Sequence, residues 1–431
     1  MVALFKALQV ILALSILIIV HEFGHFLFAR IFGIRVEKFY LFFDVGGKAL
    51  ARWRWGETEF GIGWLPFGGY CKIAGMVDES MDMGQLKRDP QPWEFRSKPA
   101  WQRLFVLAGG VLFNFIFAII MYSVICGIWG TAYISNRDSA VYPNDLAREM
   151  GFLPGDRILK LDDYEPEDFG MLQADLARRE VRCATVLRGQ DTVRLYIDQS
   201  MIGEVLNSPL MFDLAMPMVI DSVASSANAA VLAKGDVVLR LDGHDARYLQ
   251  DASPILAEHA GKTVSATVRR GCVVEDVQLQ VDTSGRIGIL VSPPVVKRQS
   301  YDALSAIPAG LKKTGSTIRG YLSDLKMVFK PSTGAYKSVG SFIAIGQVFP
   351  KKWDWYQFIN ILALLSIMLG VVNLIPIPGL DGGHIVFTLY EMITGRKPSD
   401  KFLYIMQLIG MVLIFGLMFL AFGNDIMRLI R

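Results

Sequence analysis

Four long apolar runs dominate the pattern of hydrophobic and polar positions along the chain. A helix of about 20 apolar residues is long enough to cross the hydrocarbon core of a membrane. The runs cover Ala7 to Val20 with an apolar continuation to Phe32, Leu104 to Trp129, Phe358 to Ile375, and Phe402 to Phe422. We therefore predict a polytopic α-helical membrane protein with about four transmembrane helices, in residues 1–32, 103–130, 356–395 and 396–431.

The stretch between the first two runs, residues 33–102, follows a different pattern. Residues 60–64 alternate large apolar side chains with glycine, and Pro66 and the pair Gly68-Gly69 come before a second short run, Tyr70 to Ile73. Alternation with a period of two predicts a strand, and proline with glycine predicts a turn. We expect a β-hairpin here. It is either an ordinary cytosolic hairpin or a re-entrant loop that dips back toward the membrane, which is permitted only where it lines a cavity.

Residues 131–298 have the composition of a soluble region and contain an internal repeat. Gly155 to Asp163 matches Gly235 to Gly243 at an offset of about eighty residues. Arg188-Gly189 and Arg270-Gly271, each followed by alternating apolar residues, match at nearly the same offset. Self-similarity at a fixed period indicates a duplicated structural unit. We predict two β-rich domains in tandem, 131–212 and 213–298, although the spacing by itself does not give their fold.

The segment 299–355 is predicted to be an amphipathic helical segment. Apolar residues between Tyr301 and Phe329 recur near helical spacing, with Lys312, Arg319 and Lys326 between them. Such a helix can lie on the membrane surface or pack against the tandem domains, and its periodicity does not separate the two.

The polar interruption in the first run is His21-Glu22-Phe23-Gly24-His25. On a helix, two histidines four residues apart project from one face and can share a zinc ion, and the glutamate beside them can act as a base. The alternative is a polar trio without a metal. Hydrocarbon penalises an unpaired glutamate, so ionisable residues inside a membrane-length helix favour a functional site.

A second candidate group lies between the third and fourth runs, in Asn373 to His384. Pro376 and Pro378 cannot continue a regular helix, so Asp381 lies on unwound chain beside apolar helices. Such a carboxylate needs a partner, and a metal is a good one. The alternative is a cap for the helix that starts near Gly383.

Charge gives an orientation and excludes one class of partner. Lys and Arg total 44 against 41 Asp and Glu, so the net charge of +3 does not indicate nucleic-acid binding. Basic residues are dense from Arg30 to Arg103 and again from Arg396 to Lys401. Because basic loops favour the cytoplasm, we expect both regions inside and the tandem domains outside.

The His21 to His25 motif and the Asn373 to Gly382 motif, in this order, make the chain resemble the site-2 proteases, which are intramembrane zinc metalloproteases. The order of parts is similar over nearly the whole chain. The resemblance implies that His21, His25 and Asp381 bind Zn²⁺ and that Glu22 activates water. It also implies that the tandem domains are circularly permuted PDZ modules with possible peptide ligands, and that Asn373 holds substrate backbone.

The same resemblance implies a bacterial inner-membrane enzyme of regulated intramembrane proteolysis. Its substrates would be single-span membrane proteins in the lipid bilayer, such as trimmed anti-sigma factors or signal-peptide remnants. The family usually has Gly-Pro-x-x-Asn in the second span, where this chain has Val111 in place of the proline. Asn114, the last residue of that stretch, either makes a hydrogen bond between helices or belongs to the site.

A helical substrate presents no free carbonyl, so it must unwind before it is cleaved. We expect the strand at residues 60–64 to hold it extended by edge pairing, through Gly61, Ile62 and Gly63. Three other functions stay open from the sequence. They are another class of membrane protease with an HExxH motif, a membrane-anchored PDZ binding protein with a vestigial metal site, and a transporter with a broken helix.

Overall fold

The computed structural model describes residues 2–76, 89–330 and 342–430. The chain forms two compact units. Unit 1 is built from the described parts of residues 1–130, 300–329 and 336–431, and unit 2 from those of 131–299 and 330–335. The predicted 33–102 region and the predicted 299–355 segment each include a stretch, 77–88 and 331–341, that lies outside the described residues.

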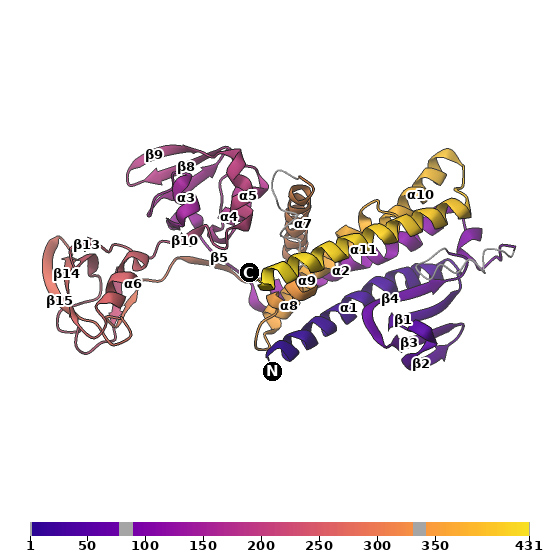
Figure 1. Ribbon diagram of the computed structural model, residues 1–431, viewed down its shortest axis with the longest axis horizontal. Helices are drawn as coiled ribbons and strands as arrows, with labels where there is room; N and C mark the ends of the chain where they lie inside the picture. Colours follow the sequence, from indigo (N-terminus) through magenta and orange to yellow (C-terminus); the bar gives the residue numbers. More distant parts are fainter. Residues whose placement is uncertain (1, 77–88, 331–341, 431) are drawn as a thin grey trace. The chain divides into compact units, whose positions relative to one another are not determined.

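Unit 1 contains the long apolar helices (Figure 1). In the described part of the chain, four helices are long and apolar enough to cross a membrane. They are α1 (Val2–Ile31), α2 (Ala100–Trp129), α9 (Trp355–Leu374) and α11 (Asp400–Ile430). Their positions match the four predicted apolar runs, and three shorter or more polar helices accompany them: α7 (Ala303–Val328), α8 (Phe342–Val348) and α10 (Asp381–Thr394).

Local sequence explains where several of these helices begin and end. Asp354 caps α9 by accepting a hydrogen bond from the backbone N–H of Gln357. The same helix ends at Leu374, because the residue before Pro376 is restricted to extended backbone. A left-handed glycine, Gly395, ends α10.

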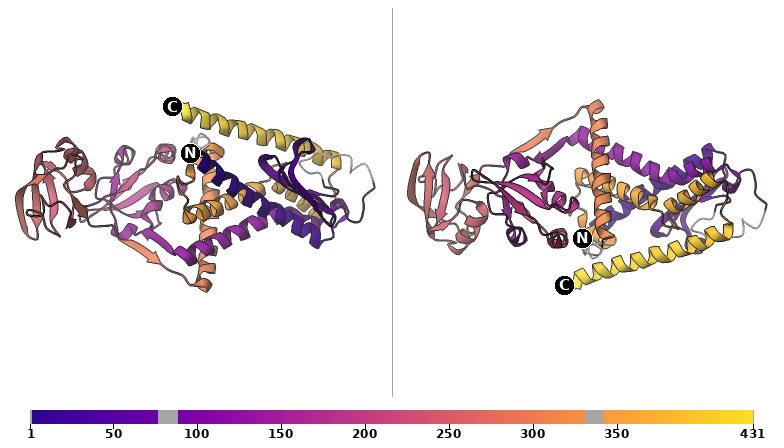
Figure 2. Two further views of the ribbon diagram at one scale, coloured as in Figure 1. Left: turned by 90° about the horizontal axis from the view of Figure 1, so that it is seen from below. Right: turned by 90° about the horizontal axis from the view of Figure 1, so that it is seen from above.

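Glycines let α1 and α2 cross in close contact (Figure 2). A Cβ atom on Gly24 would lie 2.2 Å from the carbonyl oxygen of Gly109, a separation that real Cβ atoms do not show. Small residues of this kind are what allow membrane helices to pack backbone to backbone. The crossing point therefore lies within the histidine motif itself.

The amphipathic helix α7 packs on α2 and α9. Gly310 makes the closest approach, because a Cβ atom there would lie 2.5 Å from the backbone nitrogen of Ser123. Ala306 and Thr314, four residues to either side, are buried on the same face, whereas Leu304 and Ile307 stay 81% and 56% exposed. The membrane-surface interpretation of this helix stays a prediction.

A four-stranded sheet packs against α1. Its strands are β1 (Val36–Phe43), β2 (Ala49–Trp55), β3 (Thr58–Gly63) and β4 (Leu65–Ile73), with the short 3-10 helices η1 (Val45–Gly47) and η3 (Phe95–Ser97) nearby in the chain. The order across the sheet is β2-β3-β1-β4, so β4 and β2 are its edges.

The predicted hairpin of β3 and β4 is wrong. β1 lies between these strands, parallel to β3 and antiparallel to β4, and the hairpin partner of β3 is β2. Gly68 and Gly69 are strand residues of β4 and not a turn. Gly69 is needed for a close approach, because a Cβ atom there would lie 2.5 Å from the side chain of Ile18 on α1 and 2.6 Å from the Tyr40 carbonyl oxygen.

Unit 2 holds both repeats. The first comprises β5 (Thr131–Ile134), η4 (Asn136–Asp138), β6 (Val141–Pro143), α3 (Asp145–Glu149), β7 (Arg157–Leu161), η5 (Phe169–Met171), α4 (Leu172–Arg178), β8 (Cys183–Arg188), β9 (Asp191–Tyr196), η6 (Gln199–Met201), α5 (Ile202–Asn207) and β10 (Phe212–Leu214). The second comprises β11 (Ile220–Val223), β12 (Val237–Leu241), β13 (His244–Asp245), α6 (Leu249–Glu258), β14 (Thr263–Arg270), β15 (Val273–Gln280), β16 (Ile289–Val291) and β17 (Val296–Gln299).

The sequence repeat is also a structural repeat. β7 and β12 have the same length at an offset of eighty residues, and each pairs antiparallel with the next long strand, with an irregularity after its second residue. In each repeat a buried aspartate precedes the strand and pairs with an arginine. Asp156 pairs with Arg188 at 2.8 Å, and Asp236 pairs with Arg270 at 2.7 Å. The exact domain boundaries and the PDZ identity stay predictions.

The Asp236 pair predicts a pH dependence. Hydrogen bonds from Arg270 hold the pKa of Asp236 below its usual value, even though burial acts to raise it. The stabilisation is therefore present above the unfolded pKa of about 4 and is lost as the pH falls through the lowered folded pKa. Because Arg270 is half exposed, we expect Asp236→Asn to cost only about 1–2 kcal/mol at pH 7, and less at pH 4.

Hydrogen exchange of the β12 amides in the intact protein, at both pH values, measures this difference. Asp221→Asn is the matched control, because its pair with Lys234 is solvent-exposed on both sides. Equal protection in the two variants at pH 7 would contradict a stabilising role for the buried pair.

Candidate metal centre

Three side chains from distant parts of unit 1 meet at one point. His21 and His25 project from α1, and Asp381 is the first residue of α10. The Nε2 atoms of the two histidines are 3.3 Å apart, and Asp381 Oδ2 lies 3.4 Å from each of them. Within the described residues, this is the one group of three or more such side chains that could hold a metal ion.

The chain around Asp381 is shaped by two glycines. A Cβ atom on Gly382 would lie 2.3 Å from the carbonyl oxygen of Ile375, and one on Gly383 would lie 2.6 Å from that of Ile377. These close approaches let the start of α10 fold back against the end of α9, which places Asp381 beside α1. Asp381 makes no side-chain capping hydrogen bond to α10, so the capping alternative is not what the structure shows.

The donor set fits zinc. Asp381 Oδ2 is buried and has no hydrogen-bond partner, although a buried carboxylate oxygen normally has one. Tetrahedral zinc with ligands at about 2.0–2.1 Å has ligand-to-ligand edges of about 3.3–3.4 Å, which is the size of the triangle formed by the three atoms. One carboxylate and two imidazoles are also a usual protein ligand set for this metal.

Two further contacts orient the histidine rings. His25 Nδ1 lies 2.9 Å from the Val106 carbonyl oxygen, which can only accept, so Nδ1 carries the proton and Nε2 offers its lone pair to the triangle. His21 Nδ1 lies 3.1 Å from the side-chain amide of Asn114. For Nε2 of His21 to bind a metal, Nδ1 must be protonated, and Asn114 must turn its amide oxygen toward it.

Asn114 therefore makes a hydrogen bond between helices and also contacts the metal centre, so it fits both alternatives that the sequence left open. It is fully buried, it joins α2 to α1 through His21, and its backbone carbonyl accepts a hydrogen bond from Ser366 on α9 at 2.8 Å. Asn373 also reaches the site, with its side-chain nitrogen 3.3 Å from His21 Nε2. The sequence signal for Asn114 was a lone asparagine in an apolar run, whereas Asn373 was expected from the resemblance of its motif to that of the site-2 proteases.

Glu22 lines a cavity of about 370 Å³ that opens beside the triangle. One wall is β4 from Gly69 to Ile73, and a backbone hydrogen bond from Cys71 reaches the Glu22 carboxylate. His384 on α10 and Gln407 on α11 also line the cavity and are joined at 3.0 Å. We did not predict these two residues. Gln407 interrupts the last apolar run, which is the signal that could have indicated it.

The prediction that residues 61–63 hold substrate by edge pairing is wrong. Gly61, Ile62 and Gly63 lie on β3, which is paired with β1 on one side and with β2 on the other. An interior strand has no free edge for a peptide, so edge pairing by these residues is excluded in this fold. The edge strand that lines the cavity is β4.

Comparisons with known proteins agree with this geometry. The model of peptidase family M50 matches residues 9–417. The regulator of sigma E protease of Haemophilus influenzae is 30% identical, over 97% of this chain and 98% of its own length. The regulator of sigma-E protease RseP of Salmonella typhimurium is 30% identical over the same shares. A Xylella fastidiosa protein with the provisional name zinc metalloprotease is 29% identical over 97% of both chains.

The chain belongs to peptidase family M50, the family of the site-2 proteases. It is a zinc metalloprotease of the intramembrane type, which confirms the resemblance that its two motifs indicated. The alternatives of a different membrane protease class and of a transporter are wrong.

Gly110 tests how tightly α2 closes on this centre. A Cβ atom there would lie 2.4 Å from His25 Nε2 and 2.6 Å from His21 Cε1, so Gly110→Ala must push both rings aside. We expect zinc affinity to fall by about 10- to 100-fold, as for other residues that orient metal ligands, and cleavage to fall with it. Zinc content after competition with a chelator measures the effect.

Gly127→Ala is the matched control on the same helix. A Cβ atom at that position would meet Ala306 at 3.4 Å, an ordinary contact. If Gly110→Ala retained as much zinc as Gly127→Ala, the close packing of α2 on the two histidines would not matter for metal binding.

Proposed function

We propose that His21, His25 and Asp381 hold the zinc ion of this protease and that Glu22 is its general base. The observation that carries the proposal is the buried Asp381 Oδ2 atom, unpartnered and 3.4 Å from both histidine Nε2 atoms. Zinc held there would lower the pKa of a water molecule to about 7 and polarise a substrate carbonyl.

We propose that Glu22 transfers the proton of the reaction. It lies on the same helix as the two histidines and faces the cavity between them and β4. Its carboxylate accepts a proton from the attacking water and then returns that proton to the leaving amine, so it acts first as a base and then as an acid. The contact with the Cys71 backbone fixes its orientation toward the cavity.

The substrate class follows from where the site lies. His21 and His25 are inside a helix of membrane-spanning length and composition, so the scissile bond belongs to a segment that enters the bilayer. We propose that the substrates are single-span membrane proteins of a bacterial inner membrane. Two relatives carry names that make them regulators of sigma E, which agrees with regulated proteolysis of this kind.

An unwound substrate needs new partners for its backbone. We propose that it pairs with the free edge of β4, because this strand lines the cavity and leaves one side open. Successive backbone N–H groups alternate in direction along a strand. Since that of Cys71 points toward Glu22, away from β1, the N–H of Gly69 points the same way and can donate to a bound peptide.

The ligand and base roles predict different phenotypes. We expect His21→Ala, His25→Ala and Asp381→Asn each to lower zinc content, because each removes a ligand. Glu22→Gln should keep zinc and lower the cleavage rate by about 10²- to 10⁴-fold, because it removes only the proton acceptor. Metal analysis of the purified protein, together with cleavage of a single-span substrate, measures both. Full cleavage by Glu22→Gln would contradict the role of Glu22 as the general base.

The β4 edge predicts a backbone effect. Cys71→Pro removes the outward N–H without removing a ladder bond to β1, whereas Cys71→Ala keeps that N–H. We expect the proline variant to lose cleavage and retain zinc, and the alanine variant to behave like the unaltered protein. Because the Cys71 N–H also contacts the Glu22 carboxylate, KM and kcat for the same substrate are measured separately, with zinc content as control. Loss of edge pairing raises KM, whereas a displaced base lowers kcat alone. A proline variant with an unchanged KM would contradict edge pairing at this strand.

The orientation predicts which cysteines are reachable from outside. We propose that the two PDZ-like repeats lie on the extracytoplasmic side of the membrane and that the β-sheet lies on the cytosolic side, as the distribution of Lys and Arg favours. Cys272 is exposed in the turn between β14 and β15, whereas Cys71 lines the cavity. A membrane-impermeant thiol reagent on intact cells should modify Cys272 and spare Cys71, with Cys272→Ser as control. The reverse labelling would invert the orientation.

A further inference from the structure

An ion pair at the end of α10 opposite to Asp381 is not used by the chemistry described above. Arg103, in the first turn of α2, is only 7% exposed, and its Nη2 atom lies 2.5 Å from Glu391 Oε1. Its Nε atom donates to the Lys98 carbonyl oxygen at 3.0 Å, and its guanidinium lies over the Phe95 ring. Both charged groups of the pair are largely withdrawn from solvent.

The charge of each residue is unfavourable at its position in its own helix. Arg103 places a positive charge at the N-terminus of α2, and Glu391 places a negative charge in the last turn of α10. Each charge is unfavourable with respect to the dipole of its own helix. The two residues are therefore explained by their contact with each other and not by the stability of α2 or α10 alone.

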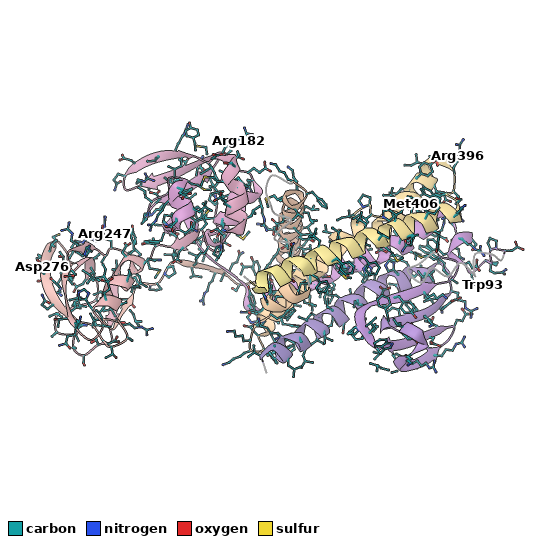
Figure 3. The ribbon with its side chains drawn as sticks, in the orientation of Figure 1. Trp93, Arg182, Arg247, Asp276, Arg396 and Met406 are labelled. Carbon is teal, nitrogen blue, oxygen red and sulfur yellow. The ribbon has the colours of Figure 1, made fainter. Side chains whose placement is uncertain are left out.

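Among the described residues, the side-chain contacts of α10 with α11 lie in its first half. Its buried residues are Gly382, Gly383 and Thr388, all small. Tyr390 and Ile393 are 50% and 84% exposed, and Arg396, labelled in Figure 3, already lies beyond the end of the helix. His384 contacts Gln407 and Phe387 contacts Phe402, both on α11. These contacts and the glycine contacts next to Asp381 hold the first half of α10, and the Arg103 contact holds the part near its end.

The Arg103–Glu391 contact lies far from Asp381 along α10, and this distance allows it to affect the geometry of the metal centre. Ten residues of helix separate Asp381 from Glu391, which is about 15 Å. A tilt of about 4° over that length moves one end by about 1 Å relative to the other, whereas zinc ligand distances tolerate only about 0.2 Å. Small changes in the direction of α10 are therefore large on the scale of the ligand triangle.

We infer that the Arg103–Glu391 pair is a positioning clamp, which sets the direction of α10 and thereby the place of Asp381 beside His21 and His25. Arg103 and Glu391 touch neither substrate nor the reacting atoms and act through Asp381. The inference rests on the proposed role of Asp381 as a ligand. That role is tested separately by the zinc content of Asp381→Asn, so failure of one is distinguishable from failure of the other.

The test uses the full chain with zinc or with Co²⁺, whose visible spectrum reports the number and arrangement of ligands. For Glu391→Gln we expect metal affinity to fall at least tenfold and the Co²⁺ bands to lose intensity. A merely structural role would lower the stability of the metal-free protein and leave the Co²⁺ spectrum unchanged. Glu57→Gln is the matched control in the same unit, because its pair with Arg30 is exposed and 4.0 Å long.

Two more variants decide the remaining outcomes. Arg103→Lys keeps the charge but cannot bridge Glu391 and the Lys98 carbonyl together, so the same spectral change is expected in a milder form. The exchanged pair, Arg103→Glu with Glu391→Arg, should recover affinity toward that of the unaltered protein. Glu391→Gln with affinity within twofold and an unchanged Co²⁺ spectrum overturns the clamp. If that variant does not fold, Arg103→Lys is judged by the same two measurements.

Discussion

A carboxylate oxygen that has been taken out of water and given no hydrogen-bond donor governs the arrangement of unit 1. Asp381 Oδ2 is in this position, between two imidazole nitrogens. Leaving such an oxygen unpaired costs several kcal/mol, more in hydrocarbon than in a soluble protein. A cation between the three atoms offsets this cost. The glycines at the helix crossing and at the start of α10 follow from the same demand, since they bring the three side chains within reach of one ion.

Some elements around the site carry the proposed reactive side chains, and others fix the positions of these side chains. α1 carries the two proposed histidine ligands and the proposed base within a turn and a half, and contacts from α2 orient the two rings. The proposed third ligand, Asp381, comes from the far end of the chain, and its position depends on the fold of the 375–380 loop and on the direction of α10. The burial of Asn114, and its bonds to His21 and from Ser366, tie α2 and α9 to the same centre. The positions of the side chains at the proposed metal site therefore depend on four helices, α1, α2, α9 and α10.

Much of this could be predicted from the sequence, for physical reasons. Membrane-length apolar runs leave few alternatives to helices, and ionisable residues within them need partners, which indicated His21, Glu22, His25 and Asp381. The order of the strands could not be predicted. Parallel pairing of β1 with β3 joins strands that are not neighbours in the chain, and glycines that usually mark turns serve close packing in β4. The contact between Arg103 and Glu391 joins residues 288 positions apart, and no local pattern reports it.

The two ends of the long segment of unit 2, residues 131–299, meet each other. β5, which begins at the first residue of the unit, pairs antiparallel with β17, so that Thr131 lies opposite Gln299. The chain therefore departs from α2 and returns toward α7 through two adjacent strands, and the loop between them is already closed at its base. Closing a loop costs an entropy that grows only slowly with its length. Because β5 and β17 close the segment at its base, the number of repeats between them changes the closure entropy of the chain only slightly, which is compatible with the duplication seen here.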